Sequence, residues 1–254
     1  MMYLCSMIQQ EEISLIFGRH PVVEALKSGQ AVDKVMLLQG TRGEVEVELR
    51  HLTRDLNVPM QMVPRERLDK LTRGNHQGVV ALMAAVAYQR LSDVLPTVYE
   101  RGEVPLLVLL DGITDVRNMG AIARSAVCAG AHALVVSLKN AAPIHADAVK
   151  TSAGALLQIP ICREPSMQSV LDMLGQNGVS VLASSLQSSK KLYDLDLTLP
   201  VALLLGSEGE GVNPAFLRQA DETFIIPQTS LTNSFNVSVA AGIMLYEALR
   251  QRVL

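Results

Sequence analysis

The chain has 254 residues, of which 49% are hydrophobic and 19% charged, and its formal net charge is −3. This length allows one large domain or two modest ones, and the apolar fraction allows a large core and a buried subunit interface. A slightly acidic chain lacks the basic surface of a protein that coats nucleic acid. No apolar run reaches the roughly 18 residues of a membrane-spanning helix, so we expect no contact with a membrane.

The cysteines, histidines and N-terminus further limit the class of protein. Cys5, Cys128 and Cys162 are odd in number and have no CxxC spacing, which favours reduced thiols in a cytoplasmic protein. The five histidines are scattered, so we predict no metal site. Residues 1–12 contain two glutamates and no basic residue, so we do not expect a signal peptide.

The first third of the chain alternates helix and strand patterns. In chain order we predict a helix at 21–26, a strand at 32–38, a helix at 44–56, a strand at 58–63, a helix at 65–71 and a strand at 78–86. These elements predict a small α/β domain over residues 14–88. Residues 89–104 are more polar and contain Pro96 and Gly102, so we predict a linker with a helical piece.

Residues 105–254 are predicted to form a second α/β domain. Residues 106–110 are a continuous apolar run that ends in Asp111 and Gly112, as expected of a strand buried on both faces. We predict further strands at 133–137, 159–162, 179–183, 201–205 and 223–226, and helices at 120–129, 146–157, 167–174, 214–219 and 237–253. Strands that alternate with helices indicate a mostly parallel sheet.

Three blocks in this second part place small or polar residues where a predicted strand gives way to a loop or helix. They are Asn118-Met-Gly-Ala-Ile-Ala-Arg124, Leu205-Gly-Ser-Glu-Gly-Glu-Gly211 and Ile226-Pro-Gln-Thr-Ser-Leu-Thr-Asn-Ser-Phe-Asn-Val-Ser238. Ligands bind at the carboxyl ends of strands in an open α/β sheet. The three blocks together therefore predict one composite site.

Each block alone also has a structural explanation. The glycines at 206–211 suit a plain turn, although the carboxylate of Glu208 is more than a turn needs. Ser234 and Asn236 are both good N-caps for the helix that follows. Arg124 alone is typical of a surface arginine. Neither a GxGxxG nor a Walker pattern is present, which disfavours a generic nucleotide-binding protein.

Charge is unevenly distributed along the chain. Residues 1–90 carry 11 Lys and Arg against 10 Asp and Glu, a net of +1, whereas residues 91–254 carry 11 against 15, a net of −4. The clearest local bias is the basic stretch at 65–76. It is either a solvated helix face and loop or a patch that contacts phosphates.

The three blocks resemble the signature motifs of the SPOUT superfamily, in particular the TrmH-type ribose 2′-O-methyltransferases. The residues that match are Asn118, Gly120 and Arg124 in the first motif, Gly206, Glu208, Gly209 and Gly211 in the second, and Ile226, Pro227, Ser234, Asn236, Val237 and Ser238 in the third. The chain departs from the third motif where Gln228 replaces Met, Ser230 replaces Gly, Thr232 replaces Val and Phe235 replaces Leu. These departures lie in the loop that the resemblance assigns to the cofactor.

Residues 17–26 and 76–78 resemble the RNA-binding substrate domain of the RlmB-like branch of this family, so the resemblance covers nearly the whole chain from about residue 14. It implies a small L30e-like α/β N-terminal domain and a SPOUT domain with a C-terminal trefoil knot. It also implies a homodimer that acts on ribosomal RNA, most specifically on a guanosine of 23S rRNA, and not on DNA. Alternatives are a ribose of tRNA or of another rRNA, and a non-catalytic RNA-binding assembly factor.

The resemblance implies S-adenosylmethionine as the cofactor. Its cofactor positions fall on Leu205, Gly206, Gly209, Ile226, Phe235 and Ser238, and its catalytic positions on Asn118, Arg124, Glu208, Ser234 and Asn236. The arginine of the first motif is commonly proposed as the base in this family. Because a guanidinium stays protonated in proteins, we expect Arg124 instead to stabilise the developing alkoxide and to bind a phosphate.

Overall fold

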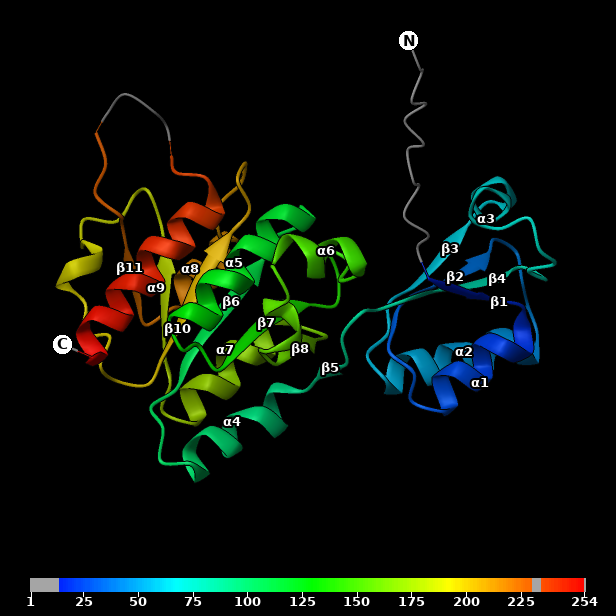
Figure 1. Cartoon of the computed structure of the whole chain (residues 1–254), viewed down its shortest axis with the longest axis horizontal. Helices are drawn as coiled ribbons and strands as arrows, with labels where there is room; N and C mark the ends of the chain where they lie inside the picture. Colours follow the sequence, from blue (N-terminus) through cyan, green and yellow to red (C-terminus); the bar gives the residue numbers. More distant parts are fainter. Residues whose placement is uncertain (1–13, 230–233, 254) are drawn as a thin grey trace, which may run out of the picture.

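The computed structural model describes residues 14–229 and 234–253, which form two lobes, each built on one sheet (Figure 1). The smaller lobe has a four-stranded sheet in the order β1-β4-β2-β3. Only β2 and β3 pair in parallel, whereas β4 is antiparallel to β1 and to β2. Its elements are β1 (Leu15–Phe17), α1 (Arg19–Lys27), β2 (Val32–Leu38), α2 (Glu44–Asp55), β3 (Met60–Val63), α3 (Arg65–Leu71) and β4 (Val79–Met83).

Alternating side chains of β2 supply two separate apolar layers in this lobe. Val35 and Leu37 pack with α1 and α2 on one face, while Met36 packs with Leu68 of α3 on the other face. Successive side chains of a strand point to opposite faces of the sheet, so this one strand contributes to the core on both sides. The sequence pattern missed β1, because three residues are too few to show it.

The larger lobe has a seven-stranded sheet in the order β11-β9-β10-β6-β7-β8-β5. Every adjacent pair is parallel, which confirms the predicted sheet type. No helix within the described ranges is long and apolar enough to cross a membrane. The elements are β5 (Tyr88–Gln89), α4 (Leu91–Glu100), β6 (Leu106–Asp111), α5 (Val116–Cys128), β7 (Ala133–Ser137), α6 (Ala146–Thr151), η1 (Ala155–Leu157), β8 (Ile161–Glu164), α7 (Met167–Gln176), β9 (Ser180–Ser184), η2 (Leu192–Asp194), β10 (Val201–Gly206), α8 (Pro214–Gln219), β11 (Glu222–Phe224) and α9 (Val237–Val253).

The central strands β6 and β10 are buried on both faces. Val108 and Leu110 of β6 belong to the apolar cluster under α5, α6 and α9, and Leu107 and Leu109 belong to the cluster under α4, α7 and α8. The segment 89–104, which we expected to be a linker with a helical piece, contains α4, and the buried face of α4 packs on this lobe.

Two predicted helices differ from the structure by a full turn or more, while the others differ by two residues or fewer at either end. The side chain of Asp115 accepts a hydrogen bond from the backbone N–H of Arg117, so α5 begins at residue 116, one turn earlier than predicted. The helix expected at 146–157 is broken, because Ala153 and Gly154 adopt left-handed φ angles of 51° and 84°. At this break a Cβ on Gly120 would lie 2.9 Å from the backbone N of Ser152, so glycine lets α5 approach α6 closely.

Candidate functional site

The candidate site lies where β6 and β10 end side by side, with Asp111 opposite Gly206. After β10 the chain turns back on itself, and the N–H of Gly211 donates to the carbonyl of Ser207 at 2.9 Å. A Cβ on Gly206 would lie 1.9 Å from the carbonyl carbon of Gly211. Only glycine therefore allows the returning loop to lie directly against the end of the strand.

A pocket of about 360 Å³ opens at this edge of the sheet. Five of the six predicted cofactor positions line it, namely Leu205, Gly206, Gly209, Ile226 and Phe235. The structure places the sixth, Ser238, in the first turn of α9 instead, where its N–H and hydroxyl donate to the side-chain oxygen of Asn236. Apolar side chains and exposed backbone groups dominate the wall, which suits a flat heteroaromatic ring such as adenine.

The sequence patterns missed one wall of this pocket, which is formed by the last residue of β9 and the three residues after it (184–187) and includes the exposed side chain of Leu186. The carboxyl ends of parallel strands meet at one edge, so the pair Ser184-Ser185 after an apolar strand was a usable signal. Gln228 and Ser234 also line the pocket. Two of the four departures from the third motif, Gln228 and Phe235, thus line the pocket, and the other two, Ser230 and Thr232, lie outside the described residues.

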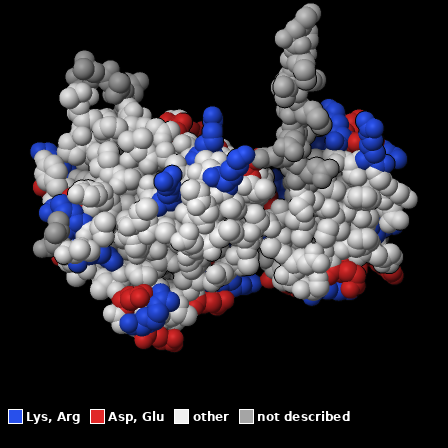
Figure 2. All heavy atoms as spheres, in the orientation of Figure 1, with Lys and Arg blue, Asp and Glu red and all other residues white. Residues whose placement is uncertain are grey.

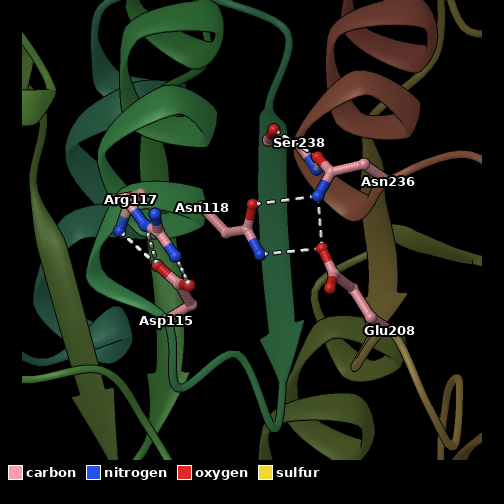
Figure 3. Close-up of polar contacts among 6 residues, drawn as sticks. All are labelled: Asp115, Arg117, Asn118, Glu208, Asn236 and Ser238. Atoms are coloured by element: carbon pink, nitrogen blue, oxygen red, sulfur yellow. Dashed lines mark hydrogen bonds and ion pairs between the residues drawn. The ribbon is translucent and has the colours of Figure 1, made fainter.

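Three polar side chains from three separate blocks meet beside the pocket (Figure 3). The amide nitrogen of Asn118, on α5, donates to Oε1 of Glu208 at 2.9 Å. The amide nitrogen of Asn236 donates to Oδ1 of Asn118 at 3.2 Å and also to Oε1 of Glu208. We call Asn118, Glu208 and Asn236 the polar triad. Two amide donors thus hold one carboxylate in a fixed direction at an accessible surface.

Asn236 has two functions in this arrangement. Its Oδ1 accepts hydrogen bonds from the backbone N–H groups of Ser238 at 3.0 Å and Val239 at 3.4 Å, as an N-cap of α9 does. Its Nδ2 is therefore directed at Glu208. Capping explains the bonds that Oδ1 accepts, but it does not require the bond that Nδ2 donates to Glu208. Ser234, the other candidate cap, is exposed and makes no hydrogen bond to the polar triad.

Arg124 stands apart from the polar triad. Its side chain is exposed and forms no hydrogen bond or ion pair with any residue that the structure describes. Arg124 comes six positions after Asn118, so the two side chains point about 120° apart around α5. Arg117, by contrast, pairs with Asp115 at 3.2 Å (Figure 3). The guanidinium of Arg124 thus keeps all its donors free for an anion.

Comparison with known proteins gives a consistent result for both lobes. Residues 105–246 match the SpoU rRNA Methylase family, and residues 15–89 match the family of RNA 2′-O ribose methyltransferase substrate-binding domains. The chain is 34% identical over 240 residues to the 23S rRNA (guanosine-2′-O-)-methyltransferase RlmB of Photorhabdus laumondii, which covers 94% of this chain and 98% of that protein. YacO, a TrmH-family protein of Bacillus subtilis, is 32% identical over 238 residues, which is 93% of this chain and 95% of that protein.

Solved structures show the same relationship. The SpoU methyltransferase AviRb of Streptomyces viridochromogenes, in complex with AdoMet, matches with a TM-score of 0.60 and 28% identity over 94% of this chain and 90% of that chain. The AdoMet-bound rRNA methyltransferase of Sinorhizobium meliloti also matches with a TM-score of 0.60 and 28% identity, over 94% of this chain and 87% of that chain. Both similarities extend across the two lobes.

Proposed function

This chain belongs to the SpoU rRNA methylase family, and on that basis we propose that it methylates a ribose 2′-hydroxyl of RNA with S-adenosylmethionine. The polar triad beside a pocket of suitable lining is the observation that supports catalysis, because a protein that only bound RNA would not need a fixed carboxylate there. The similarity to RlmB favours a guanosine of 23S ribosomal RNA as the target. We place this activity in the cytoplasm.

The two lobes support a division of labour along the chain. We assign RNA binding to an L30e-like domain over residues 14–88 and methyl transfer to a SPOUT domain over 105–254. The segment 89–104, which we predicted to be a linker, packs on the larger lobe through α4. We also assign a trefoil knot to the C-terminal part. Its support is that segments on both sides of residues 230–233 line the same pocket as the loop at 206–212. A knot requires these segments to lie close together, and few protein chains are knotted, so this proximity is a specific feature.

The pocket residues would hold the cofactor, with backbone groups of Gly206 and Gly209 toward its polar atoms and Ile226 and Phe235 against its ring. When bound, S-adenosylmethionine supplies an electrophilic methyl carbon next to a sulfonium. The carboxylate of Glu208 is electrostatically suited to a neighbouring positive charge, and the amides of the polar triad orient it. Arg124 would bind the ribose oxygen as its proton passes to water and negative charge develops there. Much of the acceleration then comes from alignment of the reacting atoms.

Transfer of labelled methyl groups to total RNA, followed by mapping of the modified nucleotide, tests this function. We expect one 2′-O-methylated guanosine in 23S rRNA and no label in DNA of the same sequence, because DNA lacks the acceptor hydroxyl. Label confined to tRNA would support the same chemistry on another target. Tight RNA binding without any methyl transfer would instead identify a non-catalytic RNA-binding factor.

The substitution Asn236→Ser separates helix capping from orientation of Glu208. Serine is also a good N-cap, so the free energy of unfolding should change by only about 0.5 kcal/mol or less. The amide donor to Glu208 is lost, and a hydrogen bond to a charged group contributes roughly 1.5–3 kcal/mol, so kcat should fall about tenfold or more. Thermal unfolding and steady-state kinetics measure both effects. Wild-type kcat in this variant would show that the contact has no part in catalysis.

We further propose that the protein is a homodimer that pairs through α9. One face of α9 is buried in the lobe, including Met244 and Leu245, yet Val239 and Tyr246 on the opposite face are 50% and 66% exposed. They line an apolar groove of about 580 Å³ with Ile243. A helix that is apolar on several sides is expected to be buried, and a second copy would cover it.

Tyr246→Glu should therefore convert the dimer to a monomer, because the interface would bury an unpaired charge. Light scattering measures the mass in solution. A matched Gln30→Glu substitution, on the exposed surface of the smaller lobe, should leave the dimer intact. A wild-type monomer, or a dimeric Tyr246→Glu variant, would contradict the proposed interface.

A further inference from the structure

A buried charged side chain of the larger lobe is inserted into the smaller lobe. Arg163, on β8, is only 5% exposed, and Asp33, on β2, is 7% exposed. The guanidinium of Arg163 donates to the backbone carbonyl of Asp33 at 2.9 Å and to that of Val32 at 3.1 Å. It also forms an ion pair with the Asp33 carboxylate at 3.9 Å. Arginine is well suited to such directional contacts, because its donors are fixed in one plane.

Tyr88 completes this interface. It lies on β5, next to β8 in the sheet, and its hydroxyl donates to the Asp33 carboxylate at 2.7 Å. The centroid of its ring lies 3.7 Å from the guanidinium carbon of Arg163, which is a cation–π contact. Burial and the nearby carboxylate raise the pKa of Tyr88, so its hydroxyl remains a hydrogen-bond donor. We call Arg163, Asp33 and Tyr88 the interlobe cluster.

The chain that connects the lobes is itself bonded to both of them. The N–H of Ala84 donates to the carbonyl of Ala31 in the smaller lobe at 2.8 Å. The next N–H, of Ala85, donates to the carbonyl of Ile144 in the larger lobe at 2.8 Å. The interlobe cluster and this connection therefore support a single orientation of the lobes.

The cluster is better suited to setting an orientation than to adding stability. Buried ion pairs often contribute less to stability than apolar residues of the same volume, because both charges lose their hydration. Arg163 also has a buried Nε without a partner among the described residues, which costs further free energy. Its directional bonds, however, are satisfied in one arrangement of the lobes only.

We propose that Arg163 is a positioning residue for RNA: through Asp33 and Tyr88 it holds the smaller lobe at one orientation, so that RNA bound there presents one ribose to the polar triad. This inference rests on the proposed methyl transfer to RNA. Lys and Arg side chains stand on both lobes of the face seen in Figure 2, as expected if RNA contacts both. The exposed cations of the smaller lobe include Arg65, Arg67, Lys70 and Arg73.

The chain offers matched controls for substitutions in the interlobe cluster. Arg163→Met removes the bonds that Arg163 makes to the smaller lobe, and Tyr88→Phe removes the single hydrogen bond from Tyr88 to Asp33. Arg252 also donates to backbone carbonyls, those of Leu197, Leu199, Val104 and Pro105, but all lie within the larger lobe. Tyr99 likewise donates to the carbonyl of Asn177 at 2.9 Å within that lobe. Arg252→Met and Tyr99→Phe thus remove similar bonds without affecting the contact between the two lobes.

The first measurement is hydrogen exchange at the amides of Ala84 and Ala85, which needs no substrate. We expect faster exchange in Arg163→Met and Tyr88→Phe than in the two controls. The second is steady-state methylation of a 23S rRNA domain that carries the mapped ribose, compared with its isolated stem-loop. If one molecule in ten keeps the competent orientation, KM for the long RNA rises about tenfold. KM for the stem-loop, kcat and the affinity for S-adenosylmethionine should stay at wild-type values.

The fidelity of methylation provides the third readout, since lobes free to rotate should also label riboses next to the target. Cluster variants that match their controls in exchange, KM and target position would overturn the inference. Tyr88→Phe is the smaller change, so it still tests the inference if Arg163→Met fails to fold. A wild-type protein that methylates no RNA would refute the proposed function, while hydrogen exchange and the affinity for long RNA would still decide the role of Arg163.

Discussion

Arg124→Lys should reduce kcat for RNA methylation about 100-fold to 1000-fold, the range measured when one donor to a developing oxyanion is removed. Lysine keeps the positive charge but loses the planar set of donors, so it cannot bind an alkoxide and a phosphate at once. Arg124 has no partner among the described residues that would hold it in another role. The affinity for S-adenosylmethionine, measured by calorimetry, should not change, because Arg124 does not line the pocket.

Arg117→Lys is the matched control for this prediction. Arg117 is on the same helix and is also exposed, but it is already paired with Asp115. The kcat of the Arg117→Lys variant should remain close to that of the wild-type protein. Turnover near wild type in Arg124→Lys would refute the proposed role, and a loss of cofactor binding in that variant would point to a structural role instead.

Gly206→Ala should destabilise the protein and abolish cofactor binding. The added Cβ would lie within 2.0 Å of backbone atoms of Gly211 and Val212, and backbone cannot rotate away as a side chain can. Overpacking of this kind costs about 1–3 kcal/mol or more, and the melting temperature falls roughly 2–4 °C for each kcal/mol in a chain of this size. Displacement of the loop at 207–212 would also deform the pocket wall.

Gly209→Ala is the control within the same loop. A Cβ at Gly209 would meet no described atom within 4 Å, and its φ is not left-handed. Its melting temperature should therefore match that of the wild-type protein. Thermal unfolding distinguishes the two variants, and calorimetry with S-adenosylmethionine measures the loss of cofactor binding in Gly206→Ala. Equal melting temperatures would show that the loop at 207–212 can move away from β10 at little cost.

The positions of most elements followed from local patterns, and the errors have local causes. The bounds predicted for β2, α3, β7 and α8 are those observed, because apolar periodicity and breaker residues are properties of a short segment. The start of α5 was wrong because the cap at Asp115 was not recognised. The break after α6 was missed because a non-glycine residue, Ala153, adopts a left-handed conformation that its type does not favour.

Local patterns in the sequence were enough to predict the two α/β parts, the parallel sheet and the three blocks that resemble one family. It left Met244 and Leu245 open between core and interface, and it grouped Arg124 with the polar residues of the site. The packing of the chain was needed to show that Met244 and Leu245 lie on the buried face of α9, that Asn118, Glu208 and Asn236 bond to one another, and that Arg163 joins the lobes. Periodicity reports which face of a segment is apolar, whereas these contacts join residues 28 to 130 positions apart, and their geometry depends on how the strands pair.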